Sequence, residues 1–156
     1  RRDTREKITV SLDEAGENDL SISIVVSYKD FDIFLGGDLT GADYLKYNYH
    51  DIESYVAEDV GKVEAMKVNH HGSSHSSNEK FIKTLSPKAA VITCGKNKYG
   101  HPRDKTLDVL NDNNVTVYQS EKSDGSNADG HIVFSSDGKS FTVETQFTRG
   151  KRFEVY

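Results

Sequence analysis

Residues 63–74 read Val-Glu-Ala-Met-Lys-Val-Asn-His-His-Gly-Ser-Ser. The apolar run at 63–68 predicts a short strand, and a polar cluster begins directly after it at residue 69. The same order, an apolar strand followed by a polar cluster that contains glycine, recurs at residues 31–38 and 89–102. Strands of one packed sheet can end at a common edge, and sites in α/β folds are commonly built there. The sequence therefore predicts that the three clusters lie close together.

The remaining pattern predicts short strands and helices in alternation. Apolar runs, alternating or continuous, predict strands at residues 8–12, 20–28, 31–35, 63–68, 89–94, 115–118, 131–134 and 140–145. Helices are expected at residues 41–59, 79–85 and 105–110. Strands come first, then strand–helix units, then strands, which suits a layered α/β sandwich with a mixed sheet.

Local signals set several of these boundaries. Asn78 is expected to cap the second helix and Pro87 to stop it, while Gly61 ends the first. Leu45, Ile52 and Val56 are the expected inward positions of that first helix, and Leu107 and Leu110 those of the third. Tight turns at Lys29-Asp30 and Asp137-Gly138 predict two hairpins.

The bulk composition limits the classes of fold and partner. The chain has 156 residues, 35% of them hydrophobic, which is enough for one domain with a small core. Its net charge of −5 gives no bulk attraction for nucleic acid or for an anionic membrane. Bound metal ions could still attract a phosphate locally. No apolar run approaches the ~18 residues that span a bilayer, so no membrane segment is expected in this chain.

The single cysteine, Cys94, lies in the apolar run at 89–94. No intrachain disulfide is possible, and we expect Cys94 to be a small buried side chain. One cysteine is compatible with any compartment, whereas a surface rich in Tyr, Asn and Ser favours an exported bacterial protein.

Asp38, His70 and His71 are the candidate metal ligands. The two oxygens of Asp38 can bridge two cations, although a turn or helix-capping aspartate is the more frequent interpretation of this residue taken alone. If residues 69–74 are extended, the side chains of His70 and His71 point to opposite faces. One can then face a metal while the other orients it or contacts the substrate. A solvated polar turn is the alternative.

Other histidines and basic residues are weaker candidates. His71 and His75 have helical i,i+4 spacing, but Gly-Ser-Ser between them is poor helix material and the glutamate of a His-Glu-x-x-His motif is missing. His101, which Pro102 should hold extended, is either a substrate contact or a loop residue. Lys96, Lys98 and Arg103 flank it and either grip a phosphate or are solvated. His50 and His131 are expected to be surface or edge residues.

The ligand count indicates an incomplete site. A pair of metal ions needs about three or four protein ligands for each ion. No histidine precedes Asp38 in this sequence. By spacing alone, the chain offers half of a binuclear site.

The order Gly-Gly-Asp38-Leu, His-His71-Gly-Ser, and Tyr-Gly-His101-Pro resembles proteins of the metallo-β-lactamase fold. The nearest branch is similar to the nuclease-like domain of bacterial DNA-uptake competence proteins, and the resemblance runs over residues 19–134. It implies a four-layer αββα sandwich made of two similar halves. Residues 1–156 correspond to the C-terminal half. The N-terminal half, with its His-x-His-x-Asp-His segment, is absent from this chain because it was lost, cleaved or left out.

The same resemblance implies roles for individual residues. Asp38 matches the carboxylate that bridges two divalent metal ions, zinc in the first place or manganese, and His71 is favoured over His70 as the histidine ligand. Ser73 and His101 match positions near the substrate. The implied function is a metal-dependent hydrolase, a phosphodiesterase or nuclease that uses a metal-activated water on DNA or on a small phosphodiester. Its implied partner is the missing N-terminal half.

Two alternatives stay open at this point. The chain could be a non-catalytic remnant or interaction module of the same fold, in which Asp38 and the histidines no longer act. It could also be a carboxylic-ester or lactam hydrolase, since one fold hosts many chemistries.

Overall fold

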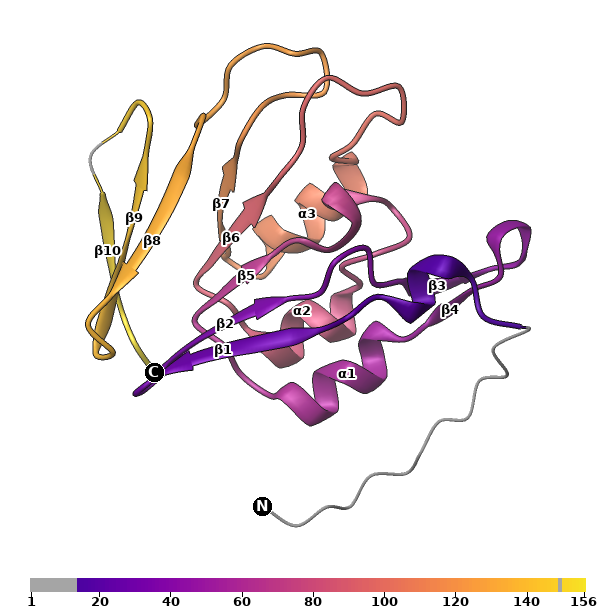
Figure 1. Ribbon diagram of the computed structural model, residues 1–156, viewed down its shortest axis with the longest axis horizontal. Coiled ribbons are helices and arrows are strands. Elements are labelled where there is room, and N and C mark those ends of the chain that lie inside the picture. Colours follow the sequence, from indigo (N-terminus) through magenta and orange to yellow (C-terminus); the bar gives the residue numbers. More distant parts are fainter. Residues whose placement is uncertain (1–13, 149) are drawn as a thin grey trace.

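A computed structural model describes residues 14–148 and 150–156 of the chain. Its centre is a five-stranded sheet in the order β1-β2-β5-β6-β7 (Figure 1). The strands are β1 (Ile24–Tyr28), β2 (Phe31–Leu35), β5 (Ala65–Lys67), β6 (Ala89–Ile92) and β7 (Thr116–Gln119). β1 and β2 form an antiparallel hairpin in which Tyr28 pairs with Phe31, and the other three neighbouring pairs are parallel. The prediction of a mixed α/β fold is confirmed.

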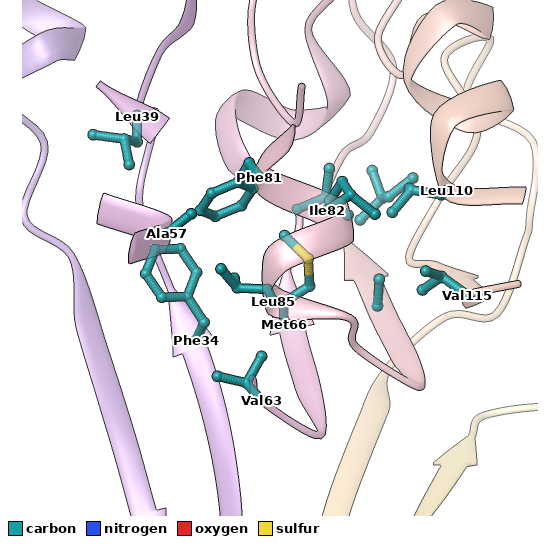
Figure 2. Packing of buried hydrophobic residues seen from close by; sticks show 13 residues of the cluster. Phe34, Leu39, Ala57, Val63, Met66, Phe81, Ile82, Leu85, Leu110 and Val115 are labelled. Atoms are coloured by element: carbon teal, nitrogen blue, oxygen red, sulfur yellow. The ribbon is translucent and has the colours of Figure 1, made fainter. Parts of the chain in front are cut away.

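Three helices cover one face of this sheet: α1 (Glu53–Val60), α2 (Glu79–Leu85) and α3 (Asp104–Asp112). Phe34, Met66 and Ala90 point to this face from three adjacent strands and pack with Phe81 and other helix residues in the main core (Figure 2). The Phe34 and Phe81 rings meet edge to face at 5.3 Å. The predicted cap is present, since Asn78 Oδ1 accepts a 2.8 Å hydrogen bond from the Phe81 amide.

A second, three-stranded sheet covers the opposite face. It has the order β10-β9-β8, with β8 (Ile132–Ser136), β9 (Ser140–Thr145) and β10 (Lys151–Glu154). Phe141 and Val143 of β9 pack on Phe31 and Ala65, the residues that alternate with the helix-facing ones along β2 and β5. The β8–β9 hairpin confirms the predicted turn at Asp137-Gly138. β10 was not predicted from the sequence.

The prediction of one helix over residues 41–59 is wrong for its first half. Residues 41–51 instead form a hairpin of β3 (Gly41–Tyr44) and β4 (Tyr49–Asp51), joined by the 3-10 turn Leu45–Tyr47. Leu45, expected inside, is 94% exposed. Tyrosine is a moderate helix former, and Asn48 takes a left-handed conformation that ends the turn. Helix α1 begins only at Glu53 and ends at the predicted Gly61.

Smaller differences concern the edges of the fold. The strand expected at 20–28 starts at Ile24. It is an edge strand, and its side chains are exposed on both faces. Cys94 is partly rather than fully buried, since its sulfur lies at the loop beside the Glu121 carbonyl, 2.9 Å away. The strand predicted at 8–12 lies outside the described residues. Within the described residues, every helix is too short or too polar to cross a membrane.

Candidate metal and phosphate site

The three polar clusters meet at one edge of the central sheet. β2, β5 and β6 are mutually parallel, so their carboxyl ends deliver residues 36–38, 69–73 and 93–101 to the same side. Backbone hydrogen bonds join the segments, from the His70 amide to the Gly37 carbonyl at 3.0 Å and from the Arg103 amide to the Gly72 carbonyl at 2.9 Å. The site is therefore built on strand ends that the core fixes.

Asp38 and His71 face each other at this edge. Asp38 Oδ1 lies 3.5 Å from His71 Nε2, and both side chains are about two-fifths exposed, at 39% and 46%. On the other side of the ring, His71 Nδ1 lies 2.5 Å from the Thr93 carbonyl oxygen. A carbonyl only accepts hydrogen bonds, so Nδ1 carries a proton, and Nε2 is the ring nitrogen that is directed toward Asp38 and can bind a cation in the neutral ring. Metal-binding histidines are commonly fixed in this way. Nε2 and the carboxylate therefore converge on one position that suits a cation.

The backbone at the two histidines differs from the extended segment that the sequence predicted. His70 and His71 both adopt left-handed conformations, with φ values of 48° and 52°, inside the 3-10 turn Asn69–Gly72. Such conformations cost non-glycine residues of order 1–3 kcal/mol each. The two rings still point to different surroundings, but because of a tight turn rather than strand alternation. Asp38 lies in a turn before Leu39 and caps no helix.

The His70 ring contacts an aromatic group. Its ring meets Tyr49 edge to face at 6.2 Å and His101 edge to face at 5.5 Å. The Asn18 amide nitrogen lies 3.3 Å from His70 Nδ1. Burial lowers the pKa of His70. Burial and the neighbouring His70 lower the pKa of His101 to about 4.

His101 lies between two cavities. One, of about 500 Å³, is lined by His71, Thr93, Cys94 and Lys96 among others, and the second, of about 520 Å³, by the residues around His70. His101 borders both. The site thus offers space for a ligand on either side of this ring.

The second cavity has a wall of aromatic rings that the sequence analysis did not anticipate. Tyr44, Tyr47 and Tyr49 come from the β3–β4 hairpin, and His75 stacks on Tyr44 at 4.3 Å. Tyr99 completes the wall, stacked on His101 at 5.7 Å. Lys98 and Arg103, two of the predicted phosphate-gripping residues, line the same cavity. The sequence analysis missed this wall because it predicted a helix over 41–59, which would place the tyrosines on different faces.

Ser73 is placed beside this cavity but is almost fully buried, at 3% exposure. Its hydroxyl accepts a 3.3 Å hydrogen bond from the His75 amide. The remaining histidines are at the edges, as expected. His50 forms a 2.6 Å pair with the buried carboxylate of Asp19, which raises the pKa of His50. His131 is exposed.

Two charged residues near the site were missed from the sequence. Lys67, at the end of β5, donates to the carbonyls of Gly37 and Val68 at 3.2 and 3.1 Å, and burial lowers its pKa. Glu53, at the start of α1, lies fully buried under residues 69–78, and burial raises its pKa to about 7. Neither residue stands in a motif, and each reaches the site only through the fold.

The donor set within the described residues is short of a complete metal site. Among them, no three His, Cys, Asp or Glu side chains gather closely enough to hold a metal ion. Asp38 and His71 supply two donors, whereas zinc sites in proteins use about three or four. The pair fits one side of a metal centre in its chemistry and orientation.

Comparisons with known proteins give one partial similarity to report. A stretch of 62 residues is 42% identical to ComE operon protein 3 of Bacillus subtilis (strain 168). The stretch covers 39% of this chain and 8% of that protein. No protein-family model matches the chain. The similarity links the chain to a bacterial protein of the competence-like branch that the sequence pattern resembles, over a part of its length.

Proposed function

We propose that this chain is the C-terminal half of a metallo-β-lactamase-like hydrolase and carries part of a binuclear metal site that cleaves phosphodiesters. The observation that carries the proposal is the Asp38–His71 pair, in which Asp38 Oδ1 lies 3.5 Å from His71 Nε2 and the other ring nitrogen, Nδ1, contacts the Thr93 carbonyl. The partial similarity to ComE operon protein 3 supports the same branch.

In this proposal Asp38 and His71 hold divalent cations, zinc or manganese. The remaining ligands come from the N-terminal half, with its His-x-His-x-Asp-His segment, as a separate or preceding part of the domain. Bound cations of this kind supply Lewis acidity and activate water for attack on phosphorus. The chain's own contribution is to orient His71 through Thr93 and to place His101 at the border of the two cavities, where it could contact a substrate phosphate.

The aromatic cavity favours one group of phosphodiester substrates over another. Its tyrosines suit either a planar base, by stacking, or a quaternary ammonium such as choline, by cation–π contact. Lys98 and Arg103 line the same cavity, and Lys105 and Arg103 lower the pKa of His75, although burial of its ring lowers it more. This positive charge disfavours a cationic ligand and favours an anionic one. We therefore propose a nucleotide-bearing substrate rather than a choline phosphate.

The test is the variant Asp38→Ala in a protein that contains both halves. We expect hydrolysis of bis-p-nitrophenyl phosphate and of an oligonucleotide, with zinc or manganese added, to fall by at least ~100-fold, since even residues that only support metal ligands contribute ~10–100-fold. Asp30→Ala is the matched control, because Asp30 is an exposed carboxylate in the turn at the opposite end of the same sheet.

Unchanged hydrolysis in Asp38→Ala would exclude the metal role. If the complete wild-type protein has no phosphodiesterase activity but hydrolyses carboxylic esters or lactams, the proposed fold family still stands, but the proposed phosphodiester substrate is wrong. Inactivity on all of these substrates, with no bound metal, would favour the non-catalytic interaction module.

A further inference from the structure

Glu53 is a buried carboxylate outside the candidate ligand set. It is 0% exposed and accepts three hydrogen bonds, from the Asn69 side-chain amide at 2.7 Å, the Ser77 amide at 2.6 Å and the Asn78 amide at 2.8 Å. All three partners are donors, so both oxygens of Glu53 are used as acceptors. A carboxyl group supplies the two acceptor oxygens that this arrangement uses.

The three donors stand at the two ends of a single segment. Asn69 directly precedes His70 and His71, and Ser77 and Asn78 end the segment just before α2. Glu53 therefore holds both ends of residues 69–78 against the start of α1. Between these hydrogen bonds lies the turn in which two successive histidines adopt left-handed conformations. A strained turn persists only where its surroundings fix it firmly.

Asn69 extends this contact to the neighbouring strand end. Its side chain lies against Gly36, where an added Cβ would sit 2.4 Å from Asn69 Oδ1. That oxygen is buried without a hydrogen-bond partner within the described part of the chain. Gly41 passes even closer to the Glu53 side chain, since a Cβ there would lie 1.9 Å from Glu53 Oε2. Glycines thus bring the segments on both sides of Asp38 into direct contact with the Glu53–Asn69 pair.

We propose that Glu53 is a positioning residue, whose hydrogen bonds to Asn69, Ser77 and Asn78 hold the His70–His71 turn so that His71 Nε2 faces Asp38. The role in metal binding rests on the function proposed above, but the positioning itself does not. Burial of a carboxylate is costly unless its hydrogen bonds are complete. This buried carboxyl group lies directly under the turn Asn69–Gly72, which orients the candidate ligand His71.

The variant Glu53→Gln tests the proposal with little change in shape. Its amide nitrogen replaces one acceptor by a donor, which faces another donor. We expect amide hydrogen exchange at residues 70–77 to accelerate at least tenfold more than exchange in the core strands β5 and β6. We also expect the imidazole resonances of His71 to shift in spectra of the full chain, because the ring loses its fixed orientation.

The control Val63→Ala separates positioning from general stability. Val63 is a buried core residue next to the opposite end of β5, and its truncation lowers stability without touching residues 69–78. We expect it to accelerate exchange in the core and in the loop by similar factors and to leave the His71 resonances in place. If Glu53→Gln behaves like Val63→Ala, with no selective loosening and no His71 shift, Glu53 is structural only and the inference is wrong.

A zinc titration of the same three proteins distinguishes the two proposals. If wild-type chain binds zinc through His71, Glu53→Gln should weaken the binding by ~10–100-fold, as for other residues that support metal ligands, and Val63→Ala should not. If zinc does not shift the His71 resonances of the wild-type chain even when the N-terminal half is supplied, the proposed function is wrong. The exchange and resonance data then still decide whether Glu53 positions the turn.

Discussion

Two carboxylates at the same edge of the sheet have opposite surroundings. Glu53 is fully buried, and all its partners are hydrogen-bond donors of the chain itself. Asp38 has 39% of its side chain exposed and lies 3.5 Å from His71 Nε2, whose ring is held by the Nδ1 contact with Thr93. The first arrangement is satisfied without any ligand, whereas the second gains from a cation. We call Glu53 and its three donors the buried layer, and Asp38 and His71 the rim of the site. The buried layer stabilises the fold, whereas the rim can bind a ligand.

We expect Glu53→Ala to cause the largest loss of stability among the variants that compare the surroundings of Glu53 with those of Asp38. The variant leaves three buried donors without an acceptor and opens a cavity, so we expect the free energy of unfolding to fall by about 3–5 kcal/mol. Urea unfolding followed by circular dichroism measures this. Glu58→Ala on the same helix is the control, because Glu58 is exposed, and it should change stability by less than ~0.5 kcal/mol. Equal effects of the two variants would contradict the buried network.

The pH dependence of stability should report on Glu53 next. Its pKa is raised from 4.5 to about 7 in the folded protein. Between these values the folded state binds more protons than the unfolded state, so stability falls as pH rises, by about 3 kcal/mol in total. Below pH 4.5 this contribution is fully present, and above pH 7 it is lost.

Urea unfolding of wild type and Glu53→Gln across pH 4.5–7.5 isolates this term, because every other titrating group is common to both. We expect the wild-type curve to fall relative to the variant over this range. A constant difference between the two curves would mean that Glu53 stays ionised in the folded protein throughout.

The contact between the two regions is tested by Gly36→Ala. A Cβ at this position would lie 2.4 Å from Asn69 Oδ1 and 2.6 Å from the Phe34 ring. Both neighbours are held in the core, so we expect a loss of about 1–3 kcal/mol from overpacking. Gly95→Ala is the control, since the close neighbour there is the Glu121 carboxylate, the end of a flexible side chain. Thermal unfolding of the two variants measures the difference, and equal melting temperatures would show that Asn69 yields easily.

The rim was more predictable from the sequence than the layer beneath it. The strand-then-cluster pattern predicted that the segments of Asp38, His71 and His101 meet, because strands of a parallel sheet end at one edge. The β1–β2 turn and the Asn78 cap were equally accessible, since both depend on residues within a few positions of each other. The finer assignment to a metallo-β-lactamase sandwich, and the metal itself, stay proposals.

What the sequence did not reveal depends on contacts between distant residues. Glu53 meets Asn69 across 16 positions and Asn78 across 25, and neither distance follows any periodic pattern. The left-handed pair His70–His71 has no glycine to signal it, so an extended segment was the natural expectation. The segment at 41–51 was predicted as a helix, but it is a hairpin whose contacts lie far along the chain, from the Gly41 amide to the His75 carbonyl at 2.8 Å and from the Asn78 side chain to the Gly41 carbonyl at 3.0 Å.

The smallest effect should come from the rim, with Asp38→Asn. The substitution keeps the shape and removes the charge of an exposed carboxylate, so we expect stability within ~0.5 kcal/mol of wild type. Metal-dependent changes at His71 should nonetheless disappear, because an amide is a far poorer cation ligand than a carboxylate. Urea unfolding of the metal-free chain, with and without 1 M sodium chloride, checks the first point. A loss above about 1 kcal/mol would mean that Asp38 already stabilises the fold through a partner in the chain. Asp38 would then resemble Glu53, and the contrast between the buried layer and the rim would be wrong.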